Sequence, residues 1–167
     1  MTHKLFILFC LFTLACTTTP EERPAIEGTW SLDAFSWSGP DTVIVVEPAQ
    51  PGIFIFDEAG YSIQWSPIRE PRTPFGNLSQ PTDEEIIAGF RSVIFNAGNV
   101  SYTDSTLNTT ARIAKVPGFE GGQQFYEYSI SDEDVLTLSM VDETYPNGDK
   151  PDWAGKWVTT YTLKRLE

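Results

Sequence analysis

Residues 53–65 read IFIFDEAGYSIQW and carry the clearest structural signal in the chain. The first four residues alternate isoleucine with phenylalanine, a composition typical of a strand. Ala59 and Gly60 then supply a turn, after which Tyr61, Ile63 and Trp65 alternate with polar or small residues. Because successive side chains of a strand point to opposite faces, this stretch predicts an antiparallel hairpin with one apolar face.

Short runs of the same kind recur on both sides of this hairpin. Residues 28–34 alternate, with Trp30, Leu32 and Ala34 on one face. Eight or nine short strands at close spacing predict an all-β fold, either an antiparallel barrel or a sandwich. The further runs span residues 42–47, 99–104, 109–116, 124–130, 135–140 and 157–166.

One segment departs from this two-residue period. Thr82 stands where a helix N-cap is expected, and Glu85 follows three residues later, which is the capping-box pattern. The apolar residues between 86 and 94 then recur at helical spacing, and residues 96–98 (Asn-Ala-Gly) supply a stop. We therefore expect one amphipathic helix of about three to four turns that packs against the barrel or plugs its end.

Residues 1–16, MTHKLFILFCLFTLAC, have the composition of a secretory signal peptide. Lys4 gives a positive start, and the apolar run that follows is too short to span a bilayer as a helix. The ending resembles a bacterial lipobox, in which the cysteine is lipidated and becomes the new N-terminus. This resemblance implies an anchor on Cys16, a polar tether over residues 17–26, and an extracytoplasmic place on the cell envelope, at the outer membrane in a Gram-negative host. Ordinary cleavage that releases a secreted protein is the alternative.

Length and charge narrow the classes of partner. The 167 residues suit one domain once the signal peptide is removed. The net charge of −12 repels nucleic-acid phosphates and anionic lipid headgroups. We therefore expect no nucleic-acid partner, and membrane attachment only through the N-terminal lipid.

The residue types that drive most catalysis are scarce. The single histidine, His3, and one of the two cysteines, Cys10, lie inside the predicted signal peptide, and the other cysteine is Cys16. After cleavage there is no imidazole base and no internal thiol, which excludes Ser-His and Cys-His catalysis and disfavours zinc, copper and haem sites. No internal disulfide can form either.

Clusters of carboxylates remain, but each has an ordinary explanation. Asp57–Glu58 and residues 132–134 stand where hairpins are expected to turn, and acidic residues are common there. The acidic stretch 142–152 lacks the ligand spacing of an EF-hand and is interpreted as a solvated loop. We expect no cofactor, no metal and no catalytic residue.

Residues 28–30, Gly-Thr-Trp, resemble the Gly-x-Trp signature of lipocalins and their bacterial lipocalin-like relatives. The order of hairpin, capped helix and later strands also resembles the bacterial lipocalin-like domain family. The resemblance implies a lipocalin-like (calycin-type) barrel over residues 27–167, with Gly28 admitting the chain closely and Trp30 closing the base beneath a basic residue of the last strand. Arg165 has the inward parity for that role, and the two would form a cation–π pair. Residues 102–104 read Tyr-Thr-Asp, so the second lipocalin motif, Thr-Asp-Tyr, is absent.

Inward parity gathers aromatic side chains in the predicted barrel. Tyrosine and tryptophan combine apolar faces with a polar tip, which suits a small, mainly hydrophobic ligand. Arg112 would bind a ligand carboxylate if the face that it shares with Ala114 points inward. The same side chains would equally fill a small barrel as its core, so a cavity and a filled barrel both stay open. The predicted ligand-binding residues are Tyr61, Trp65, Tyr102, Arg112, Tyr126, Tyr128 and Tyr161.

These observations favour a lipid-anchored extracytoplasmic protein that binds or carries a small hydrophobic molecule. Two other functions remain open. A barrel enzyme, such as an isomerase or hydratase acting on a lipophilic substrate, would be favoured by a perturbed carboxylate buried in the cavity. A filled barrel that serves as an envelope interaction module would be favoured by an exposed apolar patch without a cavity.

Overall fold

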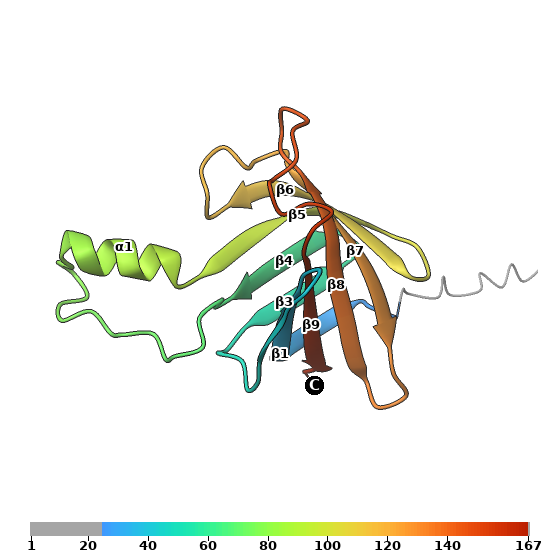
Figure 1. Ribbon diagram of the computed structural model, residues 1–167, viewed down its shortest axis with the longest axis horizontal. Helices are drawn as coiled ribbons and strands as arrows, with labels where there is room; N and C mark the ends of the chain where they lie inside the picture. The colour runs from blue at the N-terminus through green and yellow to red at the C-terminus, as the bar shows by residue number, and fades with distance from the viewer. Residues whose placement is uncertain (1–24, 167) are drawn as a thin grey trace, which may run out of the picture.

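The computed structural model describes residues 25–166, so the predicted signal peptide, Cys16 and most of the tether lie outside the described residues. The described part contains one helix and nine strands (Figure 1). The elements are β1 (Gly28–Ser38), β2 (Val43–Val46), β3 (Ile53–Asp57), β4 (Gly60–Trp65), α1 (Asp83–Arg91), β5 (Ile94–Tyr102), β6 (Thr106–Ala114), β7 (Gln123–Ile130), β8 (Val135–Thr144) and β9 (Val158–Arg165).

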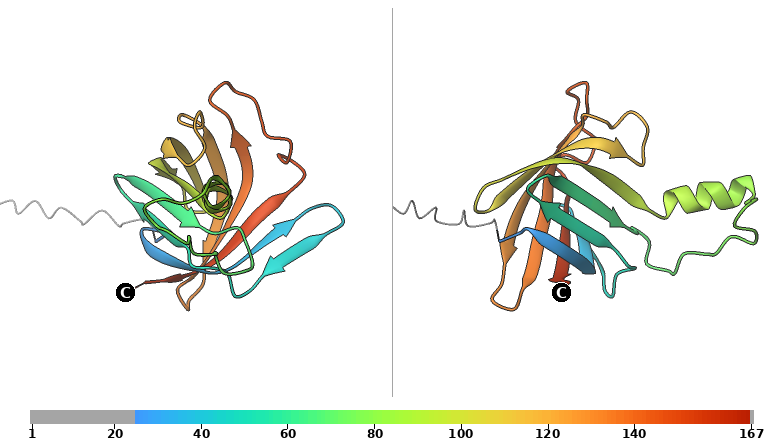
Figure 2. Two further views of the ribbon diagram at one scale, coloured as in Figure 1. Left: turned by 90° about the vertical axis from the view of Figure 1, so that its left-hand side faces the viewer. Right: turned by 180° about the vertical axis from the view of Figure 1, so that it is seen from behind.

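The strands form a closed antiparallel barrel. Each strand from β3 to β8 pairs with the next one in sequence, and β1 pairs with both β3 and β9, which closes the sheet. The short strand β2 pairs only with the second half of β1 and extends beyond the barrel (Figures 1 and 2). The predicted fold class, an antiparallel barrel of eight or nine strands with one helix, is confirmed.

The hairpin of residues 53–65 forms as β3 and β4, with Tyr61, Ile63 and Trp65 buried in the barrel. Its turn is fixed by Asp57, whose Oδ1 accepts hydrogen bonds from the amides of Ala59 and Gly60, both at 2.8 Å. Gly60 is required because a Cβ atom there would lie 2.2 Å from the carbonyl oxygen of Gly98 on β5. The turn residues therefore set how closely β4 and β5 approach.

Three strands carry one extra residue each: Asp33 in β1, Arg112 in β6 and Val141 in β8. Such a bulge leaves one residue unpaired and reverses the inward and outward alternation beyond it. In β1 the reversal places Phe35 inside, so the prediction that Ala34 follows Leu32 on the inner face is wrong. The consequences in β6 and β8 concern the candidate site and are described below.

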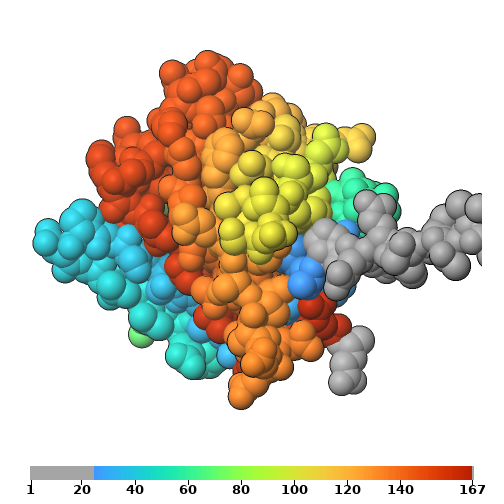
Figure 3. Space-filling model, turned by 90° about the vertical axis from the view of Figure 1, so that its right-hand side faces the viewer, coloured from blue at the N-terminus to red at the C-terminus, as the bar shows by residue number. Residues whose placement is uncertain are grey.

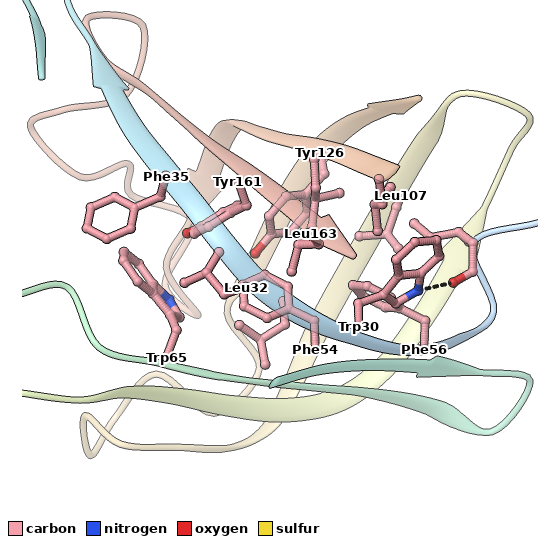
Figure 4. Packing of buried hydrophobic residues seen from close by; sticks show 14 of the residues in the cluster. Trp30, Leu32, Phe35, Phe54, Phe56, Trp65, Leu107, Tyr126, Tyr161 and Leu163 are labelled. Atoms are coloured by element: carbon pink, nitrogen blue, oxygen red, sulfur yellow. Dashed lines mark hydrogen bonds between the residues drawn. The ribbon is translucent and has the colours of Figure 1, made fainter. Parts of the chain in front are cut away.

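Aromatic and aliphatic side chains fill the middle of the barrel and one of its ends (Figure 4). Tyr161 is at the centre of an aromatic group, with its ring centroid 5.0 Å from that of Phe54 and 5.1 Å from that of Trp65, both edge to face. Such pairs add about 0.5–1.5 kcal/mol to the stabilisation that burial provides. Seen from the side away from α1, the hairpins β5–β6 (yellow) and β7–β8 (orange) cover this end of the barrel (Figure 3).

The helix α1 begins as the sequence predicts. The amide of Glu85 donates to Thr82 Oγ1 at 3.3 Å, and the amide of Thr82 donates to Glu85 Oε2 at 2.8 Å, which completes the capping box. The helix ends early, at Arg91, and residues 94–102 form β5, so the predicted stop at residues 96–98 is wrong. Pairing of Asn96 with Ile63 on β4 outweighs the local helical pattern.

The prediction that this helix packs against the barrel or plugs it is also wrong. None of its residues is buried, and it projects away from the strands (Figures 1 and 2). Its preceding loop supports it instead, since the amide of Gly76 donates to Glu85 Oε1 at 2.7 Å. In the described part of the chain, no helix is long and apolar enough to cross a membrane.

Candidate ligand-binding cavity

One end of the barrel is sealed around Trp30. Its indole Nε1 donates to the carbonyl of Ile26 at 2.8 Å (Figure 4), and the guanidinium of Arg165 lies 4.1 Å over its ring. Arg165 also donates to the carbonyls of Ala25 and Glu27, each at 2.8 Å. The structure thus brings the predicted pair together and ties the start of the domain to its last strand.

Gly28 belongs to the same seal. Its φ of 138° is a conformation that other residues rarely adopt, and a Cβ atom there would lie 2.6 Å from Arg165 Nη1. The Gly-x-Trp signature therefore has a local physical reason. The glycine leaves room for the arginine that covers the tryptophan.

The opposite end of the barrel is hollow. A cavity of about 550 Å³ opens there, within the roughly 300–1,000 Å³ typical of small-molecule sites. Its lining is rich in aromatic side chains, namely Trp37, Trp65, Phe95, Phe119, Tyr145, Trp153 and Tyr161. The barrel is therefore filled at one end and open at the other. Of the two interiors that the sequence left open, the filled barrel describes the sealed end and the cavity describes the opposite end.

The predicted ligand-binding tyrosines divide between these two ends. Tyr161 lines the cavity together with Trp65. The hydroxyls of Tyr102 and Tyr128 donate to the carbonyls of Asp57 at 3.1 Å and Thr103 at 2.8 Å, so both tyrosines hold hairpin turns at the sealed end.

The other two tyrosines lie inside the barrel wall. Tyr61 is buried, and burial raises its pKa to about 12. Tyr126 is buried beneath the cavity, and its hydroxyl donates to Oε1 of the cavity-lining Gln124 at 2.8 Å. Neither of them belongs to the cavity lining.

Arg112 does not enter the barrel. It is the unpaired residue of the β6 bulge, between Ala111, which pairs with Gly98, and Ile113, which pairs with Ala97, and its side chain is exposed. Ala114 beyond the bulge lines the cavity. The prediction that Arg112 binds a ligand carboxylate inside the barrel is therefore wrong, because the bulge separates it from the inner face.

A polar group crosses the floor of the cavity and was not predicted. Gln124 Nε2 donates to Glu143 Oε2 at 2.6 Å, and Gln124 Oε1 accepts from Asn96 Nδ2 at 3.3 Å. An ionised carboxylate can only accept, so Glu143 fixes the orientation of the Gln124 amide, which in turn fixes that of Asn96. Asn96 Oδ1 is left buried with no hydrogen-bond partner in the described structure.

The acidic member of this group, Glu143, owes its position to the bulge at Val141. Without a bulge, the alternation that begins with Leu136 and Leu138 would point Asp142 into the barrel. The extra residue shifts this alternation by one position, so Glu143 points inward opposite Gln124. Burial is the main cause that raises the pKa of Glu143; the Asp142 carboxylate adds to the rise, and the hydrogen bond from Gln124 opposes it. The interpretation of residue 143 as part of a solvated loop is wrong. The parity of Gln124 with Tyr126 was the signal in the sequence that pointed to this group.

A family model described as a lipocalin-like domain matches residues 27–164. This chain belongs to the lipocalin-like domain family. A separate comparison with curated proteins finds no matching relative. The lipocalin-like barrel is a ligand-binding fold in general, and its hollow end is where a ligand has room.

The rim of the lipocalin-like barrel carries Lys115, in the connection after β6. Its Nζ donates to the carbonyl of Phe90 at 2.8 Å and lies 4.4 Å over the Phe90 ring, which links the end of α1 to the cavity mouth. Burial lowers the pKa of this amine. Across residues 25–166, no three histidine, cysteine or acidic side chains gather in a way that could hold a metal ion.

Proposed function

We propose that this protein binds a small, mainly hydrophobic molecule in the cavity at the open end of its barrel. The observation that carries the proposal is a cavity of about 550 Å³ in a barrel that is otherwise filled. Burying an apolar ligand against aromatic walls contributes roughly 25 cal/mol per Å² of surface removed from water. Hydrophobic contact supplies the affinity, and a few polar groups orient the ligand.

We further propose that the protein works at a membrane surface, held there by lipid on Cys16. The signal-like residues 1–16 and the polar residues after them support this. Ala25 is hydrogen-bonded to Arg165 at the sealed end, opposite the cavity. An anchor attached in this way would direct the cavity away from the lipid surface. Mass spectrometry of the mature N-terminus tests the anchor, and a free Cys16 or a start at Thr17 would refute it.

Native mass spectrometry of the purified protein tests the binding function. A stoichiometric adduct released by organic solvent identifies a bound molecule. Ala114→Phe places a ring in the cavity and should abolish that adduct, whereas Ile113→Phe, on the exposed neighbouring residue, should retain it. Equal adducts in the two variants would place the bound molecule elsewhere.

A barrel enzyme is the second candidate, because Glu143 is a carboxyl group in the cavity whose pKa is raised by burial. A general acid or base works best when its pKa lies near the working pH. Enzymatic exchange of a carbon-bound proton, followed by nuclear magnetic resonance on a panel of unsaturated ketones, tests this function. Exchange that persists unchanged in Glu143→Gln would exclude Glu143 as the catalytic group.

A further inference from the structure

Glu143 stands in the cavity without a cation beside it. The ion pairs of residues 25–166 join Lys150 to Asp142, Lys164 to Asp33 and Arg165 to Asp134, and none of them includes Glu143. Removing a carboxylate from water is costly unless a positive charge or several donors compensate it. Gln124 supplies one donor, to Oε2. A ligand with a positive charge would supply the missing compensation.

The positively charged side chain in the cavity lining already has other partners. Lys115 is the only basic residue among the lining side chains, and it is held at the rim by the carbonyl and the ring of Phe90. It forms no ion pair with Glu143 within 4.0 Å. The floor of the cavity is therefore acidic, while its one positive charge lies at the mouth.

A second observation points to the same ligand chemistry. Asn96 lines the cavity and is 5% exposed, yet its Oδ1 has no donor within the described residues. A buried acceptor without a partner costs about 1–3 kcal/mol. Because the orientation of the two amides is fixed by Glu143, the group ends on an acceptor, and the molecule that completes it must donate hydrogen bonds.

The walls and the overall charge agree with a cationic ligand. The faces of tryptophan, tyrosine and phenylalanine attract cations, and seven such side chains line the cavity. The net charge of −12 draws cations toward the protein and repels anions. An amphiphile with a carboxylate head group would be repelled both by the net negative charge of the protein and by the Glu143 carboxylate.

We propose that the ligand is a lipophilic amine, with its apolar body against the aromatic walls and its protonated amino group between Glu143 and Asn96, the two neighbours of Gln124. This proposal rests on the proposed function, since it specifies the chemical class of the molecule that the cavity binds. Glu143 accepts the charged group, and Asn96 Oδ1 accepts a further hydrogen from it. The cavity then discriminates against fatty acids of the same chain length.

Three probes that differ only in head group test the proposal: dodecylamine, dodecanol and dodecanoic acid. Each is titrated into the full-length protein at about pH 8, where a free alkylamine is protonated, and binding is followed by isothermal titration calorimetry. We expect dodecylamine to bind about tenfold more tightly than dodecanol, which is the scale of one charged hydrogen bond. Dodecanoic acid should bind most weakly.

Glu143→Gln should reduce the affinity for dodecylamine about tenfold and leave that for dodecanol unchanged. The matched control is Glu127→Gln, which removes the same charge from an exposed residue of β7 and should change neither affinity. Dodecanoic acid binding as tightly as dodecylamine, or a preference for the amine that survives Glu143→Gln, would overturn the proposal. If none of the three probes binds, the proposed function fails as well. The comparison of probes on the unaltered protein does not depend on any variant folding.

Discussion

Arg165→Met tests whether the sealed end of the barrel stabilises the fold. The substitution keeps an unbranched apolar stem but removes the guanidinium from the Trp30 ring and from the carbonyls of Ala25 and Glu27. Hydrogen bonds to a charged group contribute about 1.5–3 kcal/mol each, and a cation–π contact about 0.5–2 kcal/mol. The exposed ion pair with Asp134 adds at most about 1 kcal/mol.

These contributions share one side chain and do not add in full, so we expect a loss of about 3 kcal/mol. For a domain of this size, that lowers the melting temperature by roughly 6–12 °C. The assay is urea and thermal unfolding of the full-length protein, followed by tryptophan fluorescence. Arg112→Met is the control, because Arg112 is exposed on the barrel surface and should change stability by less than about 0.5 kcal/mol. Equal unfolding midpoints for the two variants would refute this account of the seal.

Three further substitutions test separate parts of the structure. Gly28→Ala should destabilise the protein by about 1–3 kcal/mol and by more than Gly118→Ala, because both glycines have positive φ but only Gly28 faces a close atom; equal urea midpoints would contradict this. Thr82→Ala should speed amide hydrogen exchange in α1, because it removes an N-cap that contributes about 1 kcal/mol. The melting temperature should stay the same, because no residue of this helix is buried. A lower melting temperature would show that the helix supports the barrel. Glu143→Gln should stabilise the protein at pH values above the raised pKa of Glu143, because the folded state there bears the cost of the buried charge. The gain in stability should vanish as the pH falls below about 4.3, where residue 143 is protonated in the unfolded chain as well. A gain that is independent of pH in urea unfolding would disprove this origin.

The strands could be predicted because their alternation is local and strong. In the hairpin of residues 53–65, every inward residue after the turn is a large apolar one, and the glycine at the turn is the residue that the close approach to β5 demands. The seal of Trp30 by Arg165 could be predicted from a family resemblance together with the parity of the last strand. These features depend on residues whose types differ clearly between the two faces.

The cavity chemistry could not be predicted, because it depends on bulges. Arg112 and Val141 are ordinary strand residues, and nothing in their types indicates that each is an extra residue in its strand. Counting by twos therefore places Arg112 with the inner residue Ala114 and places Glu143 outside. Pairing with the neighbouring strands decides both positions, and that pairing is not visible in one strand alone.

The helix shows the opposite kind of difference. Its start is fixed by a local capping box, so Thr82 and Glu85 predict it correctly. Its end is decided by β5, which recruits residues from Ile94 onward for pairing with β4. The apolar residues Ile86, Ile87 and Phe90 remain about half exposed, so amphipathicity alone did not indicate which surface the helix covers.

Each of the three bulges changes which residues of its strand face the cavity. In β1, Trp30 and Leu32 precede the bulge and pack the core, while Trp37 follows it and lines the cavity. In β8, Leu136 and Leu138 precede the bulge, and Glu143 follows it. Selection can therefore act on the two parts of one strand separately. Substitutions at Trp37, Ala114 or Glu143 can alter what the barrel recognises while core residues such as Trp30 and Leu138 stay the same, so that ligand preference can change separately from the core.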